Sequence, residues 1–424
     1  GVLTGGYRSK DTTTETIITK TYASFDSGVM PDKSISTGTS GATPFNWSSV
    51  NTRLRTLGTA MYLTRTGNLY GGSIVDYNGQ NSYVPATIWQ IWRFVANPAY
   101  ANDATVYRVY INVKVCDSTV GLEDNCVAYG SNYKPEGLLQ KYSQKLRYAA
   151  FGYYNDSNIL RDGGVLRARM KYIGPTQPVP GSTATSNANR EWDPSTGIMV
   201  RNPDSTDASA TQTFAAAAGW TVSISDSGVM NYLNKFGNSG RPYKSFDPVS
   251  ELYYSALRYF KNQGNVASYT SLSGSWSPGS SATAANWLDD FPAITTWSDP
   301  ILYSCQKNFI LGIGDTNAWR DANLPGTTLR ATDEPAQPTE VSGDTTVNVK
   351  TATDMVGQLE GLTNLGNTYA WVGGDAGRGN TYYLAGLAYD AHTRDIRSDL
   401  TGQQTINTYW MDVYESGYIS RNQY

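Results

Sequence analysis

Alternating hydrophobic and polar residues are clearest in the segment 106–115, which reads VYRVYINVKV. Its odd-numbered residues are aromatic or aliphatic and share one face of an extended chain, so the segment is expected to be a half-buried strand. Farther upstream, 16–25 is β-prone, 49–65 is compatible with a helix, and the apolar, aromatic segment 86–95 is expected to lie in a core.

From residue 131 onward, helix and strand signals alternate along the chain. A helix is expected from Pro135 to Leu146, because Pro suits a first helical turn and leucines follow at helical spacing. The apolar run 148–154 and the segment 164–174 are expected to be strands.

Two further helices are expected at 226–237 and 247–264, with Asp226 and Asp247 as their N-caps. In the second, Pro248 takes the first helical position and Gly264 ends the helix. Its spacing predicts a buried stripe formed by Leu252, Ala256, Tyr259 and Phe260.

Residues 309–313 form an uninterrupted apolar segment, as expected of a central parallel strand that is covered on both faces. Helices at 351–361 and 381–393 and a strand at 405–413 complete the alternation. The sequence therefore predicts an open, doubly wound α/β sheet, with functional groups at the carboxyl ends of its strands. Three Pro-, Ser- and Thr-rich stretches are expected to be insertions or long loops: 175–220, 265–300 and 326–350.

The length of 424 residues allows two domains, or one with heavy insertions. We expect residues 1–105 to be a Thr-, Ser- and Gly-rich, β-prone part that is continuous with an α/β domain over 106–424. The chain starts and stops without recognisable signals, and we interpret it as a mature or excised fragment.

Charge and composition narrow the class of protein. The formal net charge is −3, so a nucleic-acid partner is not expected. Charged residues make up only 16% of the chain, while Tyr numbers 31 and Trp 11, which suits a secreted or cell-surface protein with neutral, aromatic contact surfaces. No run of 18 apolar residues occurs, so a membrane-spanning helix is not expected.

Three cysteines allow one disulfide. Cys116 and Cys126 are close in sequence at the end of a predicted strand, and we expect them to pair, which leaves Cys305 without a partner.

Asp315 and Thr316 lie just past the predicted buried strand at 309–313. Carboxylate and hydroxyl oxygens at such a position suit a hard cation, Mg²⁺ or Ca²⁺. The alternative is that Asp315 only caps the next segment and turns the chain.

Enzymatic motifs are weak throughout the chain. The Gly-rich segment 373–380 lacks the G-K-[ST] of a phosphate loop, and His392 is the single histidine, without a G-x-S-x-G elbow. Asp289 and Asp290 beside Trp287 are the remaining candidate pair, for glycoside hydrolysis. No catalytic residues are therefore assigned, and a secreted carbohydrate-binding or glycoside-hydrolysing protein is the alternative function.

Four long blocks of the chain carry a family resemblance: 126–175 (CVAYGSNYKPEGLLQ…MKYIGP), 228–260 (GVMNYLNKFG…SALRYF), 303–326 (YSCQKNFILGIGDTNAWRDANLPG) and 382–415 (YYLAGLAYDAHTRD…WMDVYE), with a weaker match at 5–13. These blocks resemble the PilY/PilC family of type IV pilus tip proteins. The resemblance implies a von Willebrand A-like, Rossmann-type domain in this region and a C-terminal propeller that would lie beyond Tyr424.

The A-type metal motif is degenerate. Asp117 and Thr119 in VCDSTVG echo its D-x-S-x-S pattern, but Gly121 replaces the second serine. We therefore expect no tightly held metal, and Mg²⁺ or Ca²⁺ would be the ion if the site survives at Asp315 and Thr316.

The resemblance also implies a function. It indicates a non-enzymatic pilus-tip adhesin and assembly factor, located outside the cell or on its surface. The expected partners are minor pilins, the pilus fibre and a host-cell or surface receptor, contacted through the long neutral loops.

Overall fold

The computed structural model describes part of the chain in full and a few further strands by their backbone alone. Full description covers 115–119, 121–156, 161–236, 244, 246–273, 281–314, 318–329, 335–369 and 380–411. Two compact units are present: the first consists of Gly1 and Gly5–Glu136, and the second of Val2–Thr4 and Gly137–Tyr424. The division between the two units follows Glu136.

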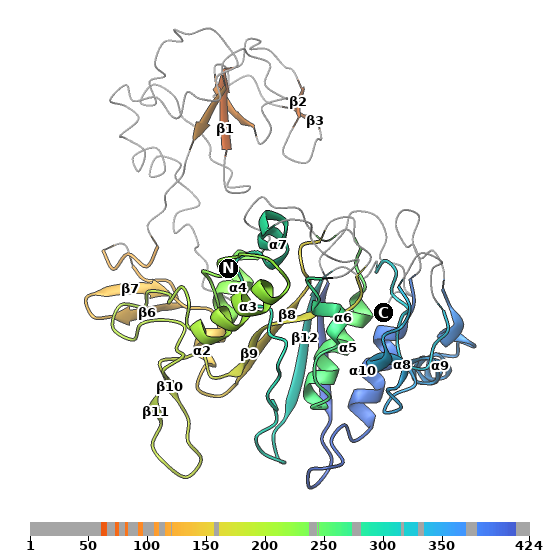
Figure 1. Ribbon diagram of the computed structural model, residues 1–424. Helices are drawn as coiled ribbons and strands as arrows, with labels where there is room; N and C mark the ends of the chain where they lie inside the picture. The colour runs from red at the N-terminus through yellow and green to blue at the C-terminus, as the bar shows by residue number, and fades with distance from the viewer. Residues whose placement is uncertain are drawn as a thin grey trace. The chain divides into compact units, whose positions relative to one another are not determined.

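The first unit is built from strands in its described part (Figure 1). An antiparallel sheet has the order β4 (Trp92–Val95), β1 (Met61–Arg65), β5 (Val106–Val109). Two antiparallel pairs accompany it: β2 (Ser73–Val75) with β3 (Asn81–Tyr83), and β6 (Cys126–Tyr129) with β7 (Asn132–Pro135).

The strand predicted at 106–115 is confirmed over Val106–Val109, whereas two helix predictions are wrong in part. Met61–Arg65 is the middle strand of the sheet and not the end of a helix, because pairing on both sides overrides local propensity. Pro135 belongs to β7, so the expected helix begins only at Leu138. The prediction for 16–25 lies outside the described residues.

The second unit mixes helices and short sheets, and is α/β. Its described elements are α2 (Leu138–Lys141), β8 (Tyr148–Gly152), β9 (Val165–Lys171), β10 (Thr176–Gln177), β11 (Thr185–Ser186), α3 (Ser205–Ala217), α4 (Val229–Lys235), α5 (Val249–Phe260), α6 (Ala267–Thr270), α7 (Ser281–Leu288), β12 (Asn308–Gly314), α8 (Thr339–Ser342), α9 (Val349–Leu359), the 3₁₀ helix η6 (Leu365–Asn367), α10 (Tyr383–Thr393) and β13 (Ile406–Asp412).

Strand pairing in this unit departs from the expected doubly wound sheet. β8 and β9 are antiparallel neighbours, and β12 and β13 form the parallel pair within the described residues. The described sheets of this unit have two strands each, so the expected large sheet is not among them. A helical connection through α8, α9 and α10 separates β12 from β13, as parallel pairing requires.

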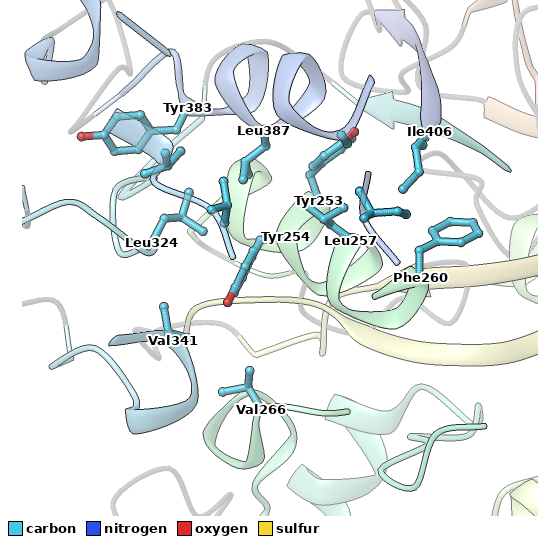
Figure 2. Close-up of a cluster of buried hydrophobic side chains, with 14 of the residues drawn as sticks. Tyr253, Tyr254, Leu257, Phe260, Val266, Leu324, Val341, Tyr383, Leu387 and Ile406 are labelled. Atoms are coloured by element: carbon cyan, nitrogen blue, oxygen red, sulfur yellow. The ribbon is translucent and has the colours of Figure 1, made fainter. Parts of the chain in front are cut away.

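Helix α5 lies at the centre of the largest hydrophobic core (Figure 2). Tyr254 and Leu257 are fully buried, and Tyr253 and Phe260 are nearly so. The predicted stripe was wrong for Leu252 and Ala256, which are only half-buried. Neighbours enclose the helix on most of its surface, and they come from all along the unit: Val266, Leu324, Val341, Tyr383, Leu387 and Ile406.

The first turns of two helices are capped from a distance and not by their predicted N-caps. In α5, the Ser250 backbone N–H donates to the Asp321 carboxylate at 2.6 Å. In α4, the N–H groups of Val229 and Met230 donate to Glu191 at 2.8 and 2.6 Å. Carboxylates suit both positions because unpaired N–H groups and the positive end of the helix dipole meet there.

Asp226 and Asp247, the predicted caps, have other interactions. Asp226 forms ion pairs with Lys235 and Arg201. The Asp247 carbonyl accepts hydrogen bonds from the backbone N–H groups of Val249 and Trp319. The sequence therefore located both helices but not the groups that cap them.

The three stretches expected to be loops carry helices and core residues, so their loop assignment was wrong in part. Residues 175–220 contain α3, whose Ala208 and Ala215 are buried. Residues 265–300 contain α6 and α7, and 326–350 contain α8. Their polar composition concealed short apolar stretches that fill the core, including Tyr269, Trp287, Leu288, Val341, Val347 and Val349.

We predict that Leu257→Ala lowers the free energy of unfolding by about 2–5 kcal/mol, because it leaves a cavity beside α5. The matched control is Leu359→Ala at the end of α9, where the side chain is 71% exposed and the loss should stay within about 0.5 kcal/mol. Urea denaturation of both variants checks this. Equal losses would contradict the central place given to α5.

Candidate interaction surface on strands β12 and β13

One face of the parallel pair β12–β13 packs onto the core around α5. Ile310 lies opposite Thr408 in the register, and Ile406 is fully buried in the core cluster. The Thr408 hydroxyl lies 2.6 Å from that of Tyr253 on α5. This face is therefore fixed by packing and by a hydrogen bond.

Gly312 lies opposite Trp410 on the same inner face. A Cβ atom at residue 312 would come within 2.0 Å of the indole ring. Glycine is therefore required here, because it lets the Trp410 ring lie across β12.

The opposite face of the pair is apolar and exposed. Because side chains alternate along a strand, the residues next to the inner-face positions all point outward. Their exposed fractions are 43% for Phe309, 52% for Leu311, 46% for Ile313, 58% for Tyr409 and 48% for Met411. We call these five residues the β12–β13 face.

The β12–β13 face is continuous across both strands. Leu311 pairs with Tyr409 and Ile313 with Met411, and the rings of Phe309 and Tyr409 lie 6.4 Å apart. Asn407 is the polar residue within the same rows, and no charged residue interrupts them. A contiguous apolar patch of this kind commonly marks a contact site.

The prediction that 309–313 is a parallel strand is confirmed. The prediction that both of its faces are covered is wrong. An uninterrupted apolar run does not distinguish burial on two faces from burial on one face plus a contact surface on the other. The strand predicted at 405–413 is also confirmed. Its alternation of Ile, Thr and Trp with Asn, Tyr and Met is the signal that divides the two faces.

The predicted metal ligands Asp315 and Thr316 lie outside the described residues, directly after β12. Asp117 and Thr119 form a local turn, in which the Thr119 N–H and hydroxyl donate to the Asp117 carboxylate at 3.0 and 2.8 Å. A turn of this kind accounts for both residues without an ion.

Cys116 and Cys126 are joined in a disulfide, with their Cα atoms 5.6 Å apart. Cys305 has a free and exposed thiol. The two sulfurs and the Glu123 carboxylate lie close enough to form a three-ligand metal group, but the disulfide occupies both sulfurs.

The candidate glycosidase residues lie in structural positions. Trp287 is 4% exposed and stacks on Tyr154, with the Arg161 guanidinium 4.9 Å from its ring, so it offers no open platform for a sugar. Asp289 and Asp290 both have left-handed backbone conformations directly after α7. These residues therefore end the helix and turn the chain.

The structure also shows where the single histidine and part of the Gly-rich segment lie. His392 is exposed in the last turn of α10. The Gly-rich segment lies outside the described residues except for Asn380, which is buried. Within the described part of the chain, no helix has both the length and the hydropathy of a membrane span.

Comparison with known proteins identifies the family. Residues 152–382, more than half of the chain, match the family described as PilY1 homolog, second domain. The chain is also 43% identical over 440 aligned residues to a curated relative, and the match covers the whole of this chain. The chain therefore belongs to the family of PilY1 homologs.

That relative is the type IV pilus biogenesis factor PilY1 homolog of Xylella fastidiosa. The chain spans 34% of the relative's length. No solved structure matches the chain.

We predict that non-reducing peptide mapping recovers Cys116 and Cys126 in one linked pair and Cys305 as a free thiol. Closing a loop of this size should stabilise the protein by roughly 2–3 kcal/mol in the chain-entropy model. Recovery of both Cys116 and Cys126 as free thiols would refute the pairing.

Proposed function

We propose that this chain is a region of a type IV pilus tip-associated adhesin and assembly factor that acts with minor pilins. The observation that carries the proposal is the β12–β13 face, where five apolar side chains are about half-exposed on a sheet anchored to the core. Its occupant is a pilus subunit. Support comes from family membership and from the relative, which is named a type IV pilus biogenesis factor.

The chemistry of the face suits protein contact better than catalysis. Tyr409, Phe309 and Met411 offer aromatic and flexible apolar area, and residues of this kind are enriched at the centres of protein interfaces. A pilus contact of standard size buries above about 1,000 Å², so the five residues would form its centre and polar neighbours its rim.

The three stretches expected to carry partner contacts are less suited to that role. α3 lies within 175–220 and places Ala208 and Ala215 in the core, so deleting this stretch would unfold part of the unit and would not test binding. Contact with the partner is therefore assigned to the β12–β13 face.

A non-enzymatic role is part of the proposal. Burial of Trp287 removes the aromatic platform that favoured carbohydrate chemistry. Turnover of a polysaccharide by the purified chain would contradict a non-enzymatic role.

The A-type fold and the cell-surface location also belong to the proposal. The parallel pairing of β12 and β13 through a helical connection supports an A-type arrangement, with Asp315 and Thr316 next in sequence after β12. Given the degenerate D-x-S-x-S motif, a Mg²⁺ or Ca²⁺ ion would be held weakly there.

We predict that Leu311→Gln weakens co-purification with minor pilins about tenfold and reduces the number of pili per cell. A tenfold loss corresponds to about 1.4 kcal/mol, which is the scale of one interface leucine. Leu359→Gln is the matched control, since that leucine is also exposed but lies at the end of α9.

Thermal unfolding of both variants should match the wild type, which shows that each remains folded. If Leu311→Gln co-purifies and piliates like Leu359→Gln, the β12–β13 face is not the pilus contact.

A further inference from the structure

Two buried carboxyl groups meet where the segment 318–329 crosses the first turn of α5. We propose that Glu251 and Asp321 hold a shared proton that fastens this segment to α5, so that the segment loosens when the proton is lost. The pair would make the chain just after β12 sensitive to pH, independently of the proposed pilus role.

Both carboxyl groups are buried, and each accepts hydrogen bonds across the contact. Asp321 accepts from α5, and Glu251 on α5 accepts from the segment 318–329. Glu251 is fully buried and Asp321 is 2% exposed. Asp321 accepts hydrogen bonds from the Ser250 N–H at 2.6 Å and from the Ser250 hydroxyl at 2.7 Å. Glu251 Oε1 accepts the Asn323 N–H at 2.7 Å.

The second oxygen of Glu251 has no hydrogen-bond donor among the described residues. Glu251 Oε2 is buried and receives no hydrogen bond from the described residues, while the Glu251 carboxyl group interacts directly with that of Asp321. Two carboxylates accept hydrogen bonds but cannot donate them. When Glu251 is protonated, its hydroxyl can donate to the Asp321 carboxyl group.

No basic side chain of the described residues is paired with either carboxyl group. Among the described residues, no lysine or arginine forms an ion pair with Glu251 or Asp321, and Arg161 and Lys244 are instead paired with Asp156. The other titratable groups that act on the pair or are acted on by it are Asp162, Asp247, Tyr153, Tyr269 and Tyr383.

Burial is the main cause of the pair's altered titration. It raises the pKa of Asp321 to about 7. The pKa of Glu251 is raised well above its usual range by burial and then by the charges of Asp321 and Asp162. A buried carboxylate beside another carboxylate is disfavoured on both counts.

The proton matters because the segment depends on these groups for its attachment. Ala322 and Leu324 are fully buried beside α5, on either side of Asn323. The Asn323 side chain donates to Asp162 at 2.7 Å, and the Thr381 hydroxyl donates to the Asp321 carbonyl at 2.7 Å. Ionising both carboxyl groups of the pair would place two adjacent negative charges inside this contact.

The direction of the pH effect follows from the raised pKa values. The closed segment binds protons that the open segment, with ordinary carboxyl pKa values, has released. Closure is therefore most stable below about pH 4 and weakens as pH rises through about 7, the folded-state pKa of Asp321.

Hydrogen exchange measured by mass spectrometry on the 424-residue chain tests the proposal between pH 5 and 8. After correction for intrinsic exchange, the equilibrium constant for opening of peptides covering 318–329 should rise about tenfold per pH unit for each proton released. Peptides from α3 should not follow this rise. A flat profile for 318–329, or an equal rise in α3, would overturn the proposal.

Glu251→Gln separates the shared proton from the packing. The amide donates to Asp321 and accepts from Asn323 as protonated Glu251 does, but it cannot titrate, so the pH dependence of 318–329 should decrease by at least one proton. Glu360→Gln, at the exposed end of α9, should behave like the wild type. If Glu251→Gln keeps the full wild-type slope, Glu251 does not carry the proton. If that variant fails to fold, the wild-type comparison of 318–329 with α3 still decides.

Discussion

Burial of helix α5 is the constraint on which the rest of the second unit depends. Most of its side chains lie inside, including Tyr253, Tyr254 and Leu257, so elements from the whole unit must surround it. The polar groups that it buries are satisfied by other segments. Tyr254 donates to Asp344 at 2.6 Å, and Ser250 donates to Asp321. Both packing and hydrogen bonding therefore hold the surrounding segments against α5.

The arrangement around α5 explains why β12 and β13 present an apolar face to solvent. Their inner rows are held by Ile406 in the core and by the hydrogen bond between Thr408 and Tyr253. Because side chains alternate in a strand, fixing the inner row also fixes the outer one. The orientation of the β12–β13 face is therefore set by the fold, and a surface that is formed before binding loses less conformational freedom when a partner docks.

Local signals predicted the elements well where periodicity was strong. The strand at 164–174, the helix at 247–264 and the strand at 405–413 are all present within or near those bounds. Prediction failed where distant residues decide the outcome. Asp321 and Glu191 cap helices that are far from them in sequence, and Met61–Arg65 is a strand because two other strands flank it.

The candidate surface could be only half predicted. The apolar run at 309–313 indicated a strand, but the same run fits burial on both faces or on one, and only the three-dimensional neighbours decide between them. The loop assignments were wrong in part for a related reason. Stretches rich in Ser, Thr and Pro looked like solvated loops, although Trp287 and Val341 within them reach the core.

Site-specific photocrosslinking in piliated cells tests most directly whether the β12–β13 face contacts a pilus subunit. A photoreactive residue in place of Leu311 or Tyr409 should give covalent adducts with a pilus subunit, whereas the same group in place of Leu359 should give none. Adducts of equal yield from all three positions, or adducts from Leu359 alone, would contradict the account.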